Sequence, residues 1–409
     1  MSRLCIFLCL GLLLYSRADA QAPVWGNYNG NAQHTGLSTV ALAGMNGIKW
    51  STPVDLNPQY SGTSLLIHYG SPLATAGNTI IVPVKTGASG GYRVEGHRGS
   101  DGALLWTQTS DYALPPHDWV PSYSPTITPT NQLYYAGEAG TVFTRSNLDT
   151  AGNIANPTRL AFYGSANYAA ASAVERAKVM INTPITSDSS GSIYFGYEVT
   201  STATLGNVTL TQGGGIAKID SSGNATFQSV SDIASSANIT DMTLRTISQN
   251  AAPAISNDGS KIYVPLTTTT GTSVNGSGYL VALNSSTLAP MSKVELMDVN
   301  SPGNNARLPD QGSASVMVAP DGKVFYGVLE NTNQFHSRGW MLQFSGDLTQ
   351  TLTPGRFGWD DTASIVPSSL IPTYTGTSSY LIMTKYNNYA GTGGDGVNKL
   401  GIFDPNATD

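Results

Sequence analysis

The chain has 409 residues, of which 44 are glycine and 11% are charged, and its formal net charge at pH 7 is −6. An acidic balance disfavours nucleic acids and anionic membranes as partners. Many glycines and 20 tyrosines with few charges favour an all-β extracellular protein over a helical enzyme.

The first twenty residues have the pattern of a secretory signal peptide. Arg3 lies in a short basic start, an apolar run extends from Leu4 to Tyr15, and small residues close the segment at Ala18 and Ala20. This run is too short to span a bilayer as a helix. We therefore expect residues 1–20 to be removed and residues 21–409 to form one secreted or periplasmic domain; a membrane anchor is the alternative.

Both cysteines, Cys5 and Cys9, fall within this segment. The mature chain would then have no disulfide, no thiol nucleophile and no cysteine metal ligand. A secreted domain without disulfides depends on a large hydrophobic core, and a chain of this length can form one.

One sequence theme returns at intervals of roughly 40 to 60 residues. It starts with a small residue or proline and a short apolar strand. A polar turn with glycine or asparagine follows, and then a second strand rich in isoleucine, tyrosine and valine. The instances begin at Ser71, Ser124, Thr183, Ala252 and Ser313, with a weaker one at Ser368.

A third strand, and often a fourth, follows each theme, most clearly in residues 214–230 and 278–296. Four short antiparallel strands per repeat are typical of a propeller blade. We predict an all-β protein, a β-propeller of four-stranded antiparallel blades, with about six blades in this chain and seven or eight in the complete protein. Two packed β-sandwiches are the competing architecture.

Three other segments bear on this architecture. Residues 47–50 (GIKW) are predicted to be an isolated strand that completes the last blade. The chain stops after a third strand, so we expect a fragment truncated at its C-terminus. Residues 169–180 are the one helix candidate, and we interpret them as an insertion in a loop.

Two short motifs resemble propellers with pyrroloquinoline quinone (PQQ)-type repeats. The residues WGNYNGN from Trp25, followed by HTG from His34, are similar to the opening of that family. The residues GSDGALLW from Gly99 resemble its tryptophan docking motif, in which Gly102 precedes Trp106 by four residues. The resemblance implies that Trp106 packs across to the neighbouring blade.

This family includes quinoprotein dehydrogenases and non-enzymatic scaffolds such as the outer-membrane assembly lipoprotein. The resemblance implies that a dehydrogenase would carry a Ca²⁺-bound quinone, a catalytic aspartate and usually an adjacent cysteine pair. The mature chain has no cysteine. We therefore expect no cofactor and no metal, with PQQ and Ca²⁺ as the alternative.

Polar and aromatic side chains precede the first strand of each repeat. In a propeller these connections surround the channel mouth, so the side chains would converge on one ligand site. Arginines there would bind an anionic or carboxylate group, and aromatic rings would stack on a sugar or a flat ring. Ordinary solvated loops are the competing explanation. The candidates are His68, Tyr69, His117, Asp118, Trp119, Tyr123, Arg176, Arg245, Arg307, Asp310, Trp359 and Asp360.

The His-Glu-x-x-His spacing of zinc proteases does not occur in the sequence. We therefore favour a monomeric, non-catalytic binding or scaffold propeller whose partner is a protein, a glycan or a small molecule. A PQQ-dependent oxidoreductase-like protein is one alternative. The other is a secreted carbohydrate-active propeller that uses Asp118, Asp310 or Asp360 as acid or base.

Overall fold

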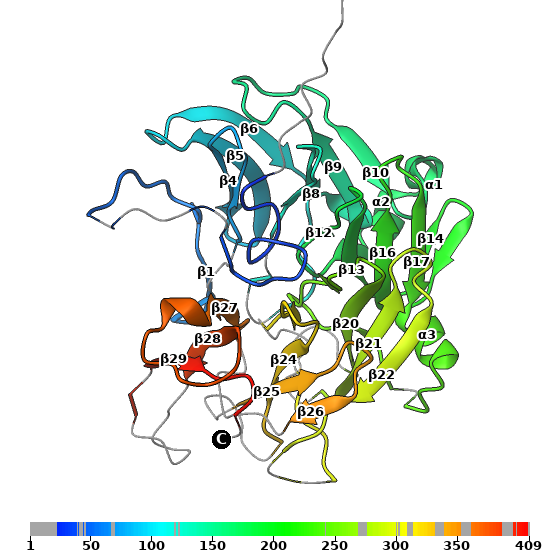
Figure 1. The fold of residues 1–409 in the computed structure, drawn as a ribbon. Helices are drawn as coiled ribbons and strands as arrows, with labels where there is room; N and C mark the ends of the chain where they lie inside the picture. Colours follow the sequence, from blue (N-terminus) through cyan, green and yellow to red (C-terminus); the bar gives the residue numbers. More distant parts are fainter. Residues whose placement is uncertain are drawn as a thin grey trace, which may run out of the picture.

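A ring of antiparallel β-sheets surrounds the N-terminal segment in the computed structural model. Figure 1 shows the sheets arranged radially, with that segment in dark blue at the centre. Residues 1–20, which are predicted to be a signal peptide and contain both cysteines, lie outside the described part of the chain. The structure describes residues 23–38, 40, 44, 46–66, 70–117, 120–121, 123–241, 243–268, 276–299, 301, 303–308, 314–331, 339–352, 361–386, 396–397 and 399–407.

Blades 1 to 3 follow one another in sequence. Blades 1 and 2 each have four strands, and blade 3 has a divided innermost strand, since β11 and β12 both pair with β13. Blade 1 contains β3 (Leu73–Ala74), β4 (Thr79–Gly87), β5 (Gly90–Arg98) and β6 (Leu104–Ser110); blade 2 contains β7 (Thr126–Ile127), β8 (Leu133–Ala136), β9 (Thr141–Arg145) and β10 (Thr158–Ala161); blade 3 contains β11 (Val179–Ile181), β12 (Thr186–Ser187), β13 (Ile193–Val199), β16 (Gly213–Ile219) and β17 (Ala225–Ser229).

Blades 4 to 6 continue around the ring. Blade 4 repeats the divided innermost strand, with β18 and β19 both paired to β20, and blade 6 has three strands in the described residues. Blade 4 contains β18 (Thr246–Ile247), β19 (Ala254–Ile255), β20 (Lys261–Thr267), β21 (Gly278–Asn284) and β22 (Pro290–Glu295); blade 5 contains β23 (Met317–Val318), β24 (Val324–Leu329), β25 (Gly339–Phe344) and β26 (Gln350–Leu352); blade 6 contains β27 (Ser364–Pro367), β28 (Tyr380–Tyr386) and β29 (Lys399–Phe403).

Short elements decorate the blades. The helix candidate at residues 169–180 forms the end of one short helix and the whole of a second, and a third helix, not predicted, follows blade 3. Among the described residues, no helix is long and apolar enough to cross a membrane. These elements are the hairpins β1 (Gln59–Ser61) with β2 (Ser64–Leu66) and β14 (Ala203–Leu205) with β15 (Val208–Leu210), the helices α1 (Ser165–Ala170), α2 (Ala173–Arg176) and α3 (Val230–Ser236), and the 3₁₀ turns η1 (Glu138–Gly140) and η2 (Ser368–Leu370).

Each of the six predicted repeats falls in a different one of the six blades, so the prediction of antiparallel propeller blades is confirmed. The repeats from Thr183 and Ala252 begin within the divided innermost strands, and the repeat from Ser368 begins after β27. The predicted strand at residues 47–50 is wrong. This segment has no strand structure, and the Trp50 indole N–H donates to the Gly99 carbonyl at 3.0 Å while its ring stacks on His97. Trp50 therefore packs on the outer turn of blade 1 instead of completing blade 6.

The core lies between neighbouring blades because successive side chains of a strand point to opposite faces. On β13, Phe195 and Tyr197 pack in the cluster shared with blades 1 and 2, and Tyr194 packs in the cluster shared with blade 4. Separate clusters fill the spaces between blades 4 and 5 and between blades 5 and 6. The blades are thus joined by apolar layers that extend around the ring.

Residues 24–36, here called the hub segment, fill the centre of the ring at one end. At this end the hub segment pairs with the innermost strand of every blade in turn, at distances of 2.6–3.1 Å. The backbone N–H groups of Ala74, Ile127, Ser187, Ile255, Val318 and Ile365 donate respectively to Trp25 O, Gly26 O, Asn27 Oδ1, Ala32 O, Gln33 O and Thr35 O.

Glycine and asparagine allow the hub segment to turn this tightly. Asn29, Gly30 and Gly36 have φ values of 46°, 96° and 62°, a region that glycine and asparagine enter most easily. At Gly36 a Cβ atom would lie 2.4 Å from Ser364 Oγ, so a larger residue would push the segment off blade 6.

His34 joins opposite sides of the ring through the hub segment. Its Nδ1 lies 2.8 Å from the Val316 carbonyl and its Nε2 lies 3.3 Å from Thr186 Oγ1, so the neutral ring donates to blade 5 and accepts from blade 3. Burial lowers the pKa of His34 to about 4. The His34 ring is therefore neutral at neutral pH, with both of its nitrogens hydrogen-bonded.

Candidate functional site

The predicted channel-mouth residues divide into two groups. His117, Tyr123, Arg176, Arg245 and Arg307 lie in the described residues, on the connections that lead into the innermost strands. The remaining candidates lie outside them, so their convergence stays a prediction. These are His68, Tyr69, Asp118, Trp119, Asp310, Trp359 and Asp360.

Tyr123 is part of a buried cluster of three tyrosines. Its ring centroid lies 4.6 Å from that of Tyr92 and 5.2 Å from that of Tyr112, and its side chain is 2% exposed. The Tyr123 hydroxyl donates to the Ala136 carbonyl at 3.2 Å. The ring is thus packed between neighbours instead of presenting a face to a sugar.

The other described candidates have local partners. His117 Nδ1 is 2.7 Å from Pro115 O and its Nε2 is 3.3 Å from Gln59 Oε1. Arg176 Nε pairs with Glu138 Oε1 at 3.1 Å, and its guanidinium lies over the Tyr168 ring. The Arg176 charge is therefore already balanced by a carboxylate.

Arg245 and Arg307 lie at the entries of blades 4 and 5. Arg245 is exposed, and its backbone N–H donates to Thr267 O at 2.8 Å. Arg307 is half-buried, and its backbone pairs with Leu329 in β24. Each of these two arginines is fixed to its own blade through its backbone.

Trp106 connects blades 1 and 2. Its indole N–H donates to the Leu148 carbonyl at 2.7 Å, and the Arg145 guanidinium lies 4.1 Å from the centre of its ring. A Cβ at Gly96 would lie 2.2 Å from this ring, so the strand beneath the indole requires glycine. Gly102, in the turn before Trp106, has a φ of 75°.

A second group of polar residues, which was not predicted from the sequence, lies between blades 3 and 4. Asn182 occupies the break between β11 and β12, and its Nδ2 donates to Thr246 Oγ1 at 3.1 Å and to Ile247 O at 3.0 Å. A Cβ at Gly196 would lie 2.7 Å from Asn182 Oδ1. Glycine at this position of β13 therefore lets the Asn182 amide approach the sheet.

Glu198 lies two residues beyond Gly196 on the same face of β13, toward blade 4. Its cross-strand partner is Gly214, where a Cβ would lie 2.6 Å from Thr246 Oγ1, the hydroxyl that accepts from Asn182, so Glu198 belongs to the part of β13 that faces Thr246. Glu198 is 2% exposed and its Oε2 atom has no hydrogen-bond partner among the described residues. Burial raises the pKa of this carboxyl to about 7.

Gln249 completes this group, in the break between β18 and β19. Gln249 lies two residues after Ile247, whose carbonyl accepts a hydrogen bond from Asn182 Nδ2. It lies directly before Asn250, whose backbone N–H donates to Asn182 O at 2.9 Å. Gln249 is fully buried, yet neither its Oε1 nor its Nε2 has a partner within the described part of the chain. We call Asn182, Glu198, Thr246 and Gln249 the blade 3–4 polar cluster.

Unpartnered buried polar atoms are uncommon because each costs about 1–3 kcal/mol of folding free energy. The blade 3–4 polar cluster has four of them: Asn182 Oδ1, Glu198 Oε2, Gln249 Oε1 and Gln249 Nε2. Perturbed carboxyls in such surroundings are typical of functional sites. Sequence reasoning missed these residues, although a glutamate inside the apolar strand YFGYEV was a usable signal.

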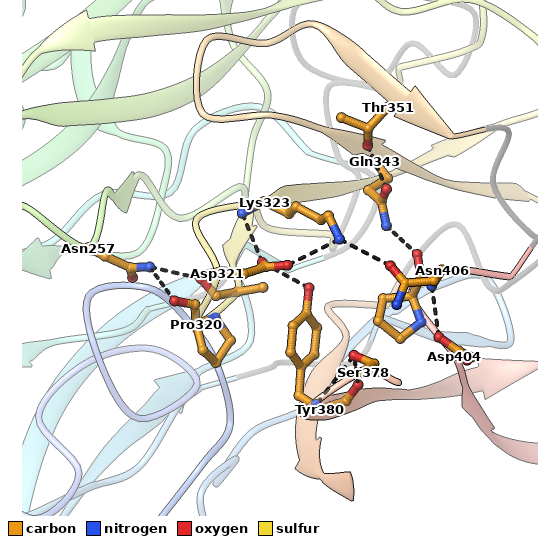
Figure 2. Close-up of polar contacts among 12 residues, drawn as sticks. Asn257, Pro320, Asp321, Lys323, Gln343, Thr351, Ser378, Tyr380, Asp404 and Asn406 are labelled. Atoms are coloured by element: carbon orange, nitrogen blue, oxygen red, sulfur yellow. Dashed lines mark hydrogen bonds and ion pairs between the residues drawn. The ribbon is translucent and has the colours of Figure 1, made fainter. Parts of the chain in front are cut away.

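The hub end of blades 4 to 6 has a different polar arrangement. Figure 2 shows that Tyr380 contacts Asp321, that Asp321 contacts Lys323, and that Lys323 contacts Asn406. The Tyr380 hydroxyl donates to Asp321 Oδ1 at 2.9 Å, and Lys323 Nζ lies 3.1 Å from Asp321 Oδ2 and 3.3 Å from Asn406 Oδ1. These pairs join blades 5 and 6 and have a structural role.

A cavity of about 340 Å³ lies beside this network, between blades 4 and 5. Lys261 Nζ, in its wall, donates to Gly346 O at 2.7 Å. Hydrogen bonds from Ser256 and Ser260 lower the pKa of Asp258 to about 2. The polar groups named here are thus already engaged within the protein.

The described residues contain no group of three histidine, cysteine, aspartate or glutamate side chains close enough to hold a metal ion. The blade 3–4 polar cluster nevertheless offers one carboxylate oxygen and two amide oxygens, which are ligands that hard cations accept. The donor chemistry therefore fits a cation in part.

Comparison with known proteins gives a fold but no sequence family. No family model matches the sequence, and no curated protein matches it. A europium-containing methanol dehydrogenase is similar in structure, with 10% identity, a TM-score of 0.51 and coverage of 89% of this chain and 69% of that one. The quinohaemoprotein alcohol dehydrogenase of Comamonas testosteroni has 10% identity, a TM-score of 0.52 and coverage of 90% of this chain and 58% of that one.

These two structures show that the chain has a β-propeller fold similar to theirs, as its motifs suggested. They also correct one expectation. We expected no cofactor, but the two similar structures reported above are enzymes that are named for one, a europium ion and a quinone with haem. The lack of cysteine in the mature chain was therefore not a sound reason to exclude a cofactor.

Proposed function

We propose that this protein is an extracytoplasmic propeller that binds a small polar ligand at the face opposite the hub segment. The observation that carries the proposal is the hub segment itself. It pairs with all six innermost strands at one end of the ring and so closes that end of the channel. The other end, with the connections that carry His117, Arg245 and Arg307, is left for a ligand.

The location outside the cytoplasm rests on the signal-peptide pattern of residues 1–20. The ligand class rests on the blade 3–4 polar cluster, whose unpartnered atoms need hydrogen bonds that the described residues do not supply. A protein or glycan partner at the same face would leave these buried atoms unsatisfied, so a small molecule is favoured.

Thermal unfolding of the purified protein with separate probes tests this proposal. The probes are ethanolamine, acetate, glucose, and PQQ with Ca²⁺. A ligand at 100 times its Kd stabilises the native state by about 2.7 kcal/mol, which raises Tm measurably. We expect at least one probe to raise Tm, and we expect Gln249→Leu to reduce that shift.

Asp258→Ala, on the hub face, is the matched control and is expected to leave the shift unchanged. A shift that survives Gln249→Leu and disappears in Asp258→Ala would place the site on the hub face and contradict the proposal. The absence of a shift with every probe would also contradict it.

A quinone-dependent oxidoreductase is a second candidate function, favoured by the two similar structures and by the oxygen ligands of the polar cluster. Glu198 and Asn182 would hold the cation, with Glu198 ionised by its presence. The quinone, when bound, would accept the electrons of an alcohol. An absorbance titration with PQQ, with and without Ca²⁺, tests this: a bound-quinone spectrum that requires Ca²⁺ and is lost in Glu198→Gln supports it, and an unchanged spectrum contradicts it.

A further inference from the structure

The blade 3–4 polar cluster has more hydrogen-bond acceptors than donors. Three of its unpartnered atoms are acceptors, namely Asn182 Oδ1, Glu198 Oε2 and Gln249 Oε1, and one is a donor, Gln249 Nε2. The second amide atom of Asn182, its Nδ2, is already used by Thr246 and Ile247. A ligand that satisfies this cluster must therefore bring several donors.

We infer that Asn182, Glu198 and Gln249 bind the primary ammonium group of a small amine that has a hydroxyl or carbonyl oxygen close to its nitrogen. This inference deepens the proposed function, on which it rests. An ammonium group has three N–H donors and one positive charge, which match three acceptors and one carboxylate. The neighbouring oxygen of the ligand accepts from Gln249 Nε2.

Charge and ligand number favour an ammonium group over a calcium ion. Calcium takes six to eight oxygen ligands, commonly with several carboxylates, whereas the cluster supplies three unpartnered oxygens and one carboxylate. A buried carboxylate without a cation is costly, and one ammonium group neutralises it without leaving excess charge.

Isothermal titration calorimetry of the full mature protein tests the inference, with ethanolamine as the probe. Choline has the same charge but no N–H donors, and ethylene glycol has the hydroxyl but no charge. We expect ethanolamine to bind and the other two probes not to bind. Glu198→Gln should abolish this binding, and Glu295→Gln, on the exposed outer strand of blade 4, should not change it.

Equal binding of choline or ethylene glycol would overturn the inference, and so would ethanolamine binding that persists in Glu198→Gln. Binding of Ca²⁺ with no binding of ethanolamine would overturn it in favour of a metal site. Far-UV circular dichroism and the unfolding temperature verify that the Glu198→Gln protein is folded. If ethanolamine fails while another probe raises Tm, the inference is wrong and the proposed binding function stands.

Discussion

Gln249 and Gln343 are both buried glutamines of this ring, and they are used in opposite ways. Gln343, 3% exposed, donates to Pro405 O at 2.6 Å and accepts from Thr351 Oγ1 at 2.5 Å, and so connects blade 5 with the C-terminal turn after blade 6 (Figure 2). Gln249, 0% exposed, has neither of its amide atoms paired within the described residues. A paired polar group stabilises a contact between blades, whereas an unpaired one costs stability and so points to a ligand.

We expect the largest loss of stability at the contact between blades 1 and 2, where the buried polar group is hydrogen-bonded. This loss is the reference for the smaller effects below. Trp106→Ala removes a buried ring and its hydrogen bond to Leu148, and it leaves a cavity beside Gly96. We expect a loss of about 3–5 kcal/mol in the free energy of unfolding, measured in urea. Trp50→Ala, at the surface of the same blade, should cost much less, and equal losses would contradict the role assigned to Trp106.

Glu198→Gln should stabilise the protein at high pH. The folded pKa of Glu198, about 7, lies above its usual value of 4.5, so the folded state binds a proton that the unfolded chain has lost. Stability from this group is complete below pH 4.5 and is lost as the pH rises to 7. The variant should gain about 3 kcal/mol at pH 8 and nothing at pH 4.

Urea unfolding at the two pH values measures this difference. His34 is present in both proteins, and its lowered pKa removes stability from both as the pH falls from 6.5 toward 4, so it cancels in the comparison. A variant that gains equally at both pH values would show that Glu198 is not a buried neutral carboxyl.

Gln343→Leu should destabilise the protein by about 2 kcal/mol, because the carbonyl of the buried Pro405 loses its donor and the Thr351 hydroxyl loses its acceptor. Chemical denaturation gives the value. A neutral result would mean that water replaces the amide, and the contrast between the two glutamines would then disappear.

Gln249→Leu is expected to have the smallest effect and the opposite sign. Leucine has a similar volume and removes two unpaired polar atoms, so a gain of about 1 kcal/mol is expected from the same denaturation experiment. A loss as large as that in Gln343→Leu would show that Gln249 makes hydrogen bonds that hold the fold together.

The repeats were predictable from sequence because each blade begins with a local pattern. Proline, a short apolar strand and a polar turn lie within about 15 residues of one another, and the hairpins from Ser71, Ser124 and Ala252 follow from that spacing. The hub segment was not predictable, because its partners lie up to 334 residues away, as for Tyr28 and Thr362. The similarity of residues 25–36 to the N-terminal residues of PQQ-type propellers drew attention to the segment, but it did not predict that the segment joins all the blades.

The candidate site was harder to predict for a similar reason. Glu198 stands in a strand, Asn182 in a break between strands and Gln249 in the corresponding break of the next blade, and tertiary packing alone brings them together. The predicted site residues were chosen only from the loops before the innermost strands, because polar residues are frequent there in the sequence. A charged side chain in an otherwise apolar strand was the signal that deserved more weight.

The hub segment has a consequence for the time course of folding. Its hydrogen bonds extend from Ala74 to Ile365, so the earliest structured residues of the chain have partners that appear only when the sixth blade has been made. Contacts between such distant residues slow folding, because the intervening chain must first be ordered. If the chain is exported N-terminus first, the hub segment crosses the membrane before its partners and cannot complete its hydrogen bonds until blade 6 has followed.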